Sequence, residues 1–181
     1  MPATDFDSFV QQQQDNKENI KEFWGRERDQ YIDYVNKVYG TIEEFLAPWT
    51  STGSVTIEYH EQEIHEEDTG VYNVRKCIIS IGNRFIALTP IGTQLIGTKG
   101  RIDISGAFGR SRLILVDKDA TGIRVSVTHV DLNDPQSSKA EKPPEKEIDW
   151  TWKIVSNPPN MKFIEFNKEN FLSKIMEISN G

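Results

Sequence analysis

The first part of the chain has the hydrophobic spacing of an amphipathic helix. Between residues 15 and 47 apolar side chains recur at steps of three and four residues, which places them along one stripe. The stripe comprises Ile20, Trp24, Tyr31, Val35, Val38, Ile42, Phe45 and Leu46. Asp15 and Glu18 form a capping box at the start, and Pro48 predicts the end. We expect a long helix over residues 15–47.

Two features predict interruptions of this helical region. Residues 4–14, which include four consecutive glutamines, are typical of a short separate helix. Gly40 costs helix stability and is followed by a second capping box formed by Thr41 and Glu44, so a break is expected there.

From Ser54 onward the hydrophobic period changes to two, and Gly, Pro, Asn and Asp interrupt the chain at short intervals. This pattern is typical of consecutive antiparallel strands joined by turns. The predicted strands cover residues 54–64, 71–81, 84–89, 94–97, 100–105, 111–117 and 122–130. Because sequence neighbours usually pair, we expect a meander that is strongly twisted or curled toward a barrel.

The last third begins with linker composition. Residues 131–147 contain three prolines, eight charges and no aromatic residue, which predicts a long mobile loop, either disordered or functional as a lid. Alternation over residues 148–154 then predicts a buried strand, and residues 161–166 predict another. Asn167 caps a predicted helix over residues 167–179, whose core-facing stripe is Phe171, Leu172, Ile175 and Met176.

These elements predict an α+β fold with a long N-terminal amphipathic helix, an antiparallel meander sheet of about seven to nine strands and a short C-terminal helix. We expect residues 1–49 to be a helical segment that packs on the sheet or on a partner. Residues 50–181 would form the antiparallel β domain. With 181 residues the chain is long enough to bury one core.

Composition indicates a cytoplasmic protein that is not inserted in a membrane. The start of the chain lacks the basic and apolar regions of a secretory signal, and the apolar runs are far shorter than a membrane span. Cys77 is the single cysteine, so an intramolecular disulfide and a cysteine-rich metal site are excluded. We expect neither a cofactor nor a metal.

Charge is sorted along the chain although the net charge is only −7. Residues 50–68 carry six acidic side chains and no Lys or Arg, whereas residues 69–130 carry nine basic and three acidic side chains. Such segregation indicates binding of charged surfaces. The acidic candidates for contact with a basic protein partner are Glu58, Glu61, Glu63, Glu66 and Glu67.

A basic set in successive predicted strands suggests an anion-binding face. Its members are Lys99, Arg101, Arg110, Arg112 and Arg124. If the strands are adjacent, these side chains converge on one solvent-facing surface able to hold phosphate or carboxylate. The alternative is that they pair with nearby acids such as Asp103 and Asp117, or with the acidic helix.

Several apparent motifs have simpler interpretations. Residues 92–100 resemble a phosphate-binding loop, but Thr98 separates Gly97 from Lys99 and a strand pattern follows instead of a helix. His60 and His65 are five residues apart, so in one strand they point to opposite faces and do not share a metal.

The remaining candidates for chemistry are isolated residues. His129 ends a buried strand face without a nucleophile tied to it by any motif, and the apolar neighbours of Cys77 predict burial and a raised thiol pKa.

The leading hypothesis is a non-catalytic cytoplasmic interaction module, such as an acidic inhibitor or immunity-type protein or an accessory subunit of a larger assembly. The alternative is a binder of a phosphorylated ligand or nucleic acid through the basic set. A hydrolase with a site near His129 is the weakest of the three, and no catalytic residue is assigned. Self-association through the N-terminal helix is also open.

Overall fold

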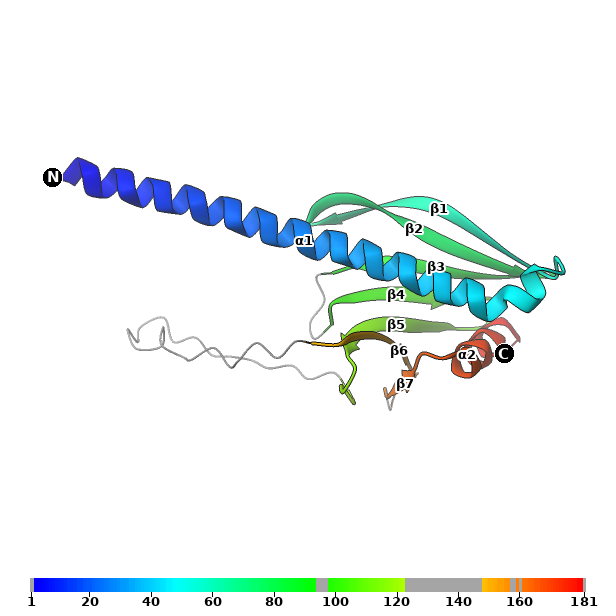
Figure 1. The fold of residues 1–181 in the computed structure, drawn as a ribbon. Coiled ribbons are helices and arrows are strands. Elements are labelled where there is room, and N and C mark those ends of the chain that lie inside the picture. Colours follow the sequence, from blue (N-terminus) through cyan, green and yellow to red (C-terminus); the bar gives the residue numbers. More distant parts are fainter. Residues whose placement is uncertain (1, 94–97, 123–147, 157–158, 160, 181) are drawn as a thin grey trace.

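The computed structural model describes residues 2–93, 98–122, 148–156, 159 and 161–180. Its described elements are a helix, seven strands and a second helix, in that order along the chain (Figure 1). The predicted strand at 94–97, nearly all of the one at 122–130, and the loop 131–147 lie outside the described residues. The predicted α+β fold, with a long first helix and a short last one, is confirmed.

Helix α1 spans Pro2–Thr50 as one continuous helix. The predicted start at Asp15 is therefore wrong: Asp15 accepts a hydrogen bond from Gln11 Nε2 at 2.9 Å, one turn earlier, instead of capping the helix. The expected break at Gly40 is also absent, because buried Tyr39 and Ile42 on either side of it pack on the sheet. Pro48 lies in the last turn, so the helix ends only two residues later.

The strands form one seven-stranded antiparallel sheet in the order β1-β2-β3-β4-β5-β6-β7, which is the predicted meander and is not closed into a barrel. Their bounds are β1 Val55–Glu66, β2 Gly70–Ile81, β3 Arg84–Gly92, β4 Gly100–Ser105, β5 Arg110–Asp117, β6 Trp150–Val155 and β7 Phe163–Glu165. Among the described strands, β1 and β7 are the two edges of the sheet. Strand β4 begins directly at Gly100, in agreement with a strand rather than a phosphate-binding helix.

The core lies between one face of the sheet and the second half of α1 (Figure 1). Tyr31 is the first fully buried residue of α1, and Val35 is also 0% exposed. Polar anchors fix the register of helix and sheet. The Tyr39 hydroxyl donates to the Arg75 carbonyl oxygen at 2.9 Å, and Trp152 Nε1 donates to the Tyr34 carbonyl oxygen at 3.2 Å.

Helix α2, Lys168–Asn180, packs at one end of the same core beside the last turns of α1 (Figure 1). The predicted cap is confirmed, since the Asn170 amide donates to Asn167 Oδ1 at 2.9 Å. Phe171 and Ile175 are buried as expected, whereas Met176 is 59% exposed. With both helices on one side, the other face of the sheet carries no described helix.

Among the residues that the structure describes, no helix is both long and apolar enough to pass through a bilayer.

Candidate functional site

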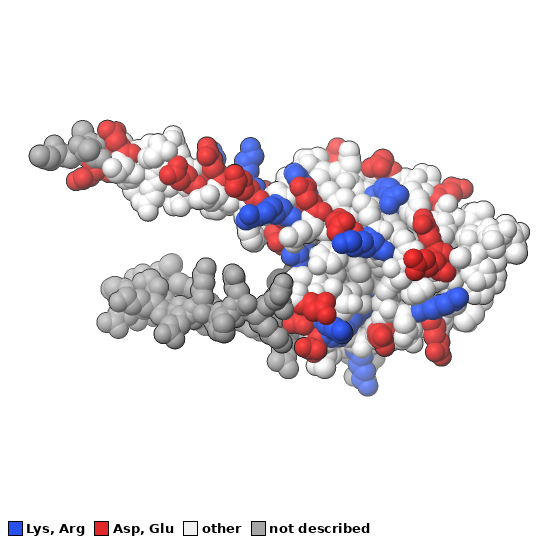
Figure 2. Space-filling model, in the orientation of Figure 1, with Lys and Arg blue, Asp and Glu red and all other residues white. Residues whose placement is uncertain are grey.

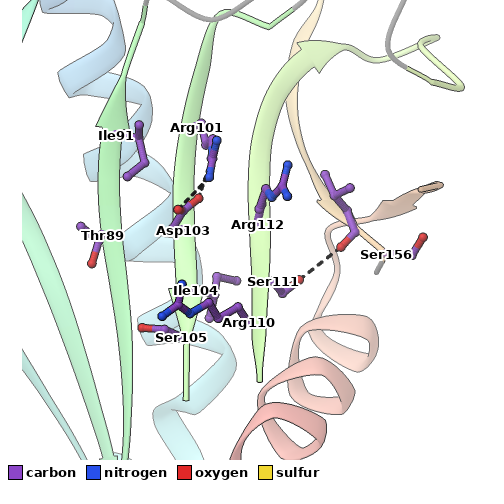
Figure 3. Close-up of a pocket in the computed structure, with 11 residues that line it drawn as sticks. Thr89, Ile91, Arg101, Asp103, Ile104, Ser105, Arg110, Ser111, Arg112 and Ser156 are labelled. Atoms are coloured by element: carbon purple, nitrogen blue, oxygen red, sulfur yellow. Dashed lines mark hydrogen bonds and ion pairs between the residues drawn. The ribbon is translucent and has the colours of Figure 1, made fainter. Parts of the chain in front are cut away.

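A groove of about 450 Å³ lies on the outer face of the sheet, across β3 to β6 and away from α1 (Figure 3). Strand alternation places its charged side chains there. In β4, Gly100, Ile102 and Ile104 are buried, so Arg101, Asp103 and Ser105 point outward. In β5, buried Ser111 and Leu113 likewise turn Arg110 and Arg112 outward. The register pairs Asp103 with Arg112 and Ser105 with Arg110.

The groove has a surplus of positive charge. Arg101 binds Asp103 through two hydrogen bonds, with Nε to Oδ1 at 2.5 Å and one terminal nitrogen to Oδ2 at 2.8 Å. Among the described residues, neither Arg110 nor Arg112 has an ion-pair partner. The described lining therefore contains three guanidinium groups and one carboxylate, and that carboxylate is already bound to Arg101 (Figure 3).

Hydroxyl-bearing residues also line the groove. The Ser111 hydroxyl is buried and donates to the Val155 carbonyl oxygen at 3.3 Å, whereas Ser156 Oγ accepts a hydrogen bond from the Lys162 amide at 2.7 Å. Thr89 and Ser105 also line the groove. Its described lining has no histidine, cysteine or lysine. The arrangement can hold an anion by charge-assisted hydrogen bonds.

The structure brings together only part of the predicted basic set. Arg101, Arg110 and Arg112 share the groove. Lys99 does not line it: its Nζ lies 3.3 Å from Glu27 Oε1 of α1 and 5.1 Å from the centre of the Trp150 ring. Arg124 lies outside the described residues. Lys99 and Arg101 thus form ion pairs with acidic residues, whereas Arg101, Arg110 and Arg112 converge on one groove.

The predicted acidic contacts lie on the edge strand and its turn. Glu58, Glu61 and Glu63 are carried by β1, and Glu67 lies in the turn that follows. These charges have a structural role even without a partner, because charged side chains keep the edge strands of different molecules apart. Figure 2 shows both acidic and basic side chains over the helix-bearing side of the sheet domain.

Glu66 differs from the other acidic candidates because its carboxylate turns inward. It accepts hydrogen bonds from the Tyr72 hydroxyl at 2.7 Å, the Thr69 hydroxyl at 2.8 Å and the Thr93 amide at 2.7 Å. A Cβ on Gly92 would overlap Glu66 Oε1, so the strand end packs directly against the carboxylate. Glu66 therefore stabilises the junction between the β1–β2 turn and the end of β3.

The other candidates of the sequence are dispersed. His60 lies 3.7 Å from Glu58, and His65 Nε2 lies 2.6 Å from Glu63 Oε1, both on the solvent-exposed strand. Within the described residues no three His, Cys, Asp or Glu side chains are grouped to hold a metal. Cys77 is fully buried, and this burial raises the pKa of its thiol to about 12. His129 is outside the described residues.

Sequence reasoning missed the contributions of β3 and β6 to the groove. Thr89 and Ile91 come from β3, and Val155 and Ser156 come from the end of β6 and the residue after it. Strand parity marks Thr89 as outward-facing, but its neighbours in space depend on pairings between distant segments. Comparison with family models, with curated proteins and with solved structures finds no match to this chain.

Proposed function

We propose that the protein is a non-catalytic binding protein whose outer sheet face holds a phosphate-bearing ligand in the groove of Arg101, Arg110 and Arg112. The observation that carries this proposal is the placement of Arg110 and Arg112 in one groove without acidic partners among the described residues. Like charges close together on one strand repel each other, and a bound anion would offset that repulsion.

Phosphate is favoured over a single carboxylate by the number and type of donors. A guanidinium group offers a planar set of donors that binds two phosphate oxygens at once. With Asp103 engaged by Arg101, the groove has an excess of two positive charges, which matches a phosphate dianion. The ligand is either a small phosphorylated molecule or the backbone of a single-stranded nucleic acid.

The test is calorimetric titration with inorganic pyrophosphate, a nucleoside monophosphate and a short single-stranded oligonucleotide, each at low and high salt. We expect binding that weakens at high salt, and loss of at least about tenfold in affinity for the double variant Arg110→Ala and Arg112→Ala. Preference for the oligonucleotide would identify nucleic acid as the source of the phosphate. The double variant Arg28→Ala and Lys37→Ala removes the same charge from α1 and should bind normally.

A variant that should bind phosphate more tightly strengthens this test. Asp103→Asn releases Arg101 from its ion pair, so it should bind phosphate more tightly than the unmodified protein. Affinity that is unaffected by salt, or equal in the Arg110→Ala, Arg112→Ala variant and the unmodified chain, would rule the proposal out.

A basic protein partner at the acidic edge is the second candidate. The observation that favours it is the position of Glu58, Glu61 and Glu63 on β1, which is a 12-residue edge strand among the described strands. Glu67 extends this surface, whereas Glu66 is occupied internally. A pull-down from host extract tests it: a stoichiometric basic partner lost with Glu58→Lys and Glu61→Lys supports this function.

A further inference from the structure

The first half of α1 projects beyond the sheet (Figure 1). Every residue from 5 to 23 is exposed, and the ion pair of Glu27 with Lys99 marks where the helix reaches the strands. The projecting part of about 20 residues is about 30 Å long. A helix of this length is marginal in water on its own, and most helices in proteins are stabilised by packing of an apolar face.

The projecting part carries such an apolar face without a partner in the described structure. Its exposed large apolar residues are Phe6 (65%), Phe9 (54%), Val10 (38%), Ile20 (58%) and Phe23 (46%). At about 100° per residue they lie on the side of α1 that, further along, packs Tyr31, Val35 and Ile42 on the sheet. The stripe that covers the sheet thus continues beyond the sheet.

The geometry points to a second copy of this chain as the occupant, with the two projecting helices packed antiparallel. The apolar positions follow heptads, with Phe6, Gln13 and Ile20 at one core position and Phe9, Asn16 and Phe23 at the other. These six residues form three pairs that share one midpoint along the sequence, between residues 14 and 15. The pairs are Phe6 with Phe23, Phe9 with Ile20, and Gln13 with Asn16.

Antiparallel packing about this centre brings each of these pairs together. Phe6 of one copy lies opposite Phe23 of the other, Phe9 lies opposite Ile20, and the polar pair Gln13 and Asn16 occupies the middle. The core pairs extend from Phe6 to Phe23, and the flanking positions Asp5 and Arg26 still precede the contact of Glu27 with Lys99, so the overlap fits the projecting length.

Charge complementarity selects the antiparallel arrangement over the parallel one. Residues 5–15 carry three acidic and no basic side chains, whereas residues 17–28 carry four basic and three acidic ones, and Figure 2 shows acidic side chains alone toward the free end. Asp5 and Arg26 occupy the same flanking heptad position and are both exposed. In antiparallel packing Asp5 of each copy lies beside Arg26 of the other, so the pair forms twice. In a parallel dimer Asp5 would instead face Val10 of the other copy.

This assembly goes beyond the proposed ligand binding, since it uses residues remote from the groove. The first experiment measures the mass of the full chain in solution over a concentration series. We expect a dimer whose dissociation constant rises at least about tenfold when Phe9 and Ile20 are both replaced by Gln. Gln11→Ala, on the opposite side of the helix, is the matched control. Both variants should keep the unfolding midpoint of the isolated chain, because these residues are exposed in one copy.

The second experiment determines the direction of packing. Chains carrying Phe9→Cys and chains carrying Ile20→Cys are mixed and oxidised, and the buried Cys77 does not interfere. Antiparallel packing gives mixed disulfides between the two kinds of chain, whereas parallel packing gives disulfides between like chains. Arg26→Glu should weaken the dimer by about tenfold, and adding Asp5→Arg to the same chain should restore it.

Three results would overturn the inference. They are a monomer mass throughout the concentration series, disulfides between like chains only, and no rescue by the Asp5→Arg, Arg26→Glu charge exchange. Capture of a different protein on this stripe while the pure chain remains monomeric would also reject a second copy as the occupant.

Discussion

The Tyr31 hydroxyl donates a hydrogen bond to the Arg101 carbonyl oxygen at 2.8 Å and accepts one from the Gly92 amide at 3.2 Å. One side chain of α1 therefore joins the end of β3 to the start of β4 on the core side. Gly100 makes room for the ring, since a Cβ there would lie 2.5 Å from Tyr31 Cε2. The backbone that carries Arg101 into the groove is thus held from beneath by the helix.

Tyr31→Phe should lower the free energy of unfolding by about 1–3 kcal/mol, because it leaves the buried Gly92 amide without its acceptor. Urea unfolding followed by circular dichroism measures the change. Tyr34→Phe is the matched control, since no partner of its hydroxyl is found among the described residues. Equal stability of the two variants would show that the bridge contributes nothing.

Glu66→Gln should destabilise the fold by about 1–3 kcal/mol. The amide replaces an acceptor oxygen with an NH₂ group that faces donors from Tyr72 and Thr93. The adjacent exposed Glu67→Gln makes the same chemical change and should stay within about 0.5 kcal/mol of the unmodified chain. Denaturant melts of both variants decide the matter, and similar losses at the two positions would contradict the assigned role.

Stability should fall as the pH rises above about 9. Burial raises the pKa of Cys77 to about 12 and raises the pKa of Tyr31 and Tyr39 further above their ordinary value. The unfolded chain therefore loses these protons at a lower pH than the native chain does. The stabilising contribution is complete below the ordinary thiol pKa and declines as the pH rises toward about 12.

Urea unfolding between about pH 8 and about pH 10.5 measures this decline. Cys77→Ala should make the free energy of unfolding fall less steeply with pH at the lower end of this range, where the thiol of the unfolded chain ionises first. In the native protein at neutral pH the thiol should not react with an aromatic disulfide reagent, and it should react fully in denaturant. Stability that stays constant over the range would disprove the expectation.

Two glycines should respond to alanine with opposite signs. Gly40 lies inside α1, and an alanine Cβ there would have no neighbouring atom within 4 Å, so Gly40→Ala should stabilise the protein by up to about 1 kcal/mol. At Gly106 the Cβ would overlap the Ile178 carbonyl oxygen, so Gly106→Ala forces backbone movement and should cost about 1–3 kcal/mol. Thermal melts test both, and a shift of the same sign at both sites would refute the packing argument.

The fold could be predicted from the sequence because its signals are local. Alternation and turn residues marked each described strand, and Asn167 marked the start of α2. The start of α1 was missed because capping residues such as Asp15 are tolerated on an exposed helix, where they bond one turn away. The length of an exposed helix depends on what it packs against, which local patterns do not contain.

The site was predicted only in part because it depends on partners that are distant in sequence. Strand parity correctly grouped Arg101 with Asp103, and the register added Arg112 beside them. Parity alone also grouped Lys99 with them, yet Lys99 reaches Glu27, which is 72 residues earlier. Glu66 resembled its acidic neighbours in sequence, and only the approach of Thr93 shows its inward role.

The continuity of α1 has a mechanical consequence. The same unbroken helix that bears the exposed Phe6 and Phe9 also carries Tyr31, whose hydroxyl donates a hydrogen bond to the backbone carbonyl oxygen of Arg101. Because the helix is stiff, any tilt of its projecting half would reach the backbone of Arg101 through the Tyr31 hydroxyl, without a change in secondary structure.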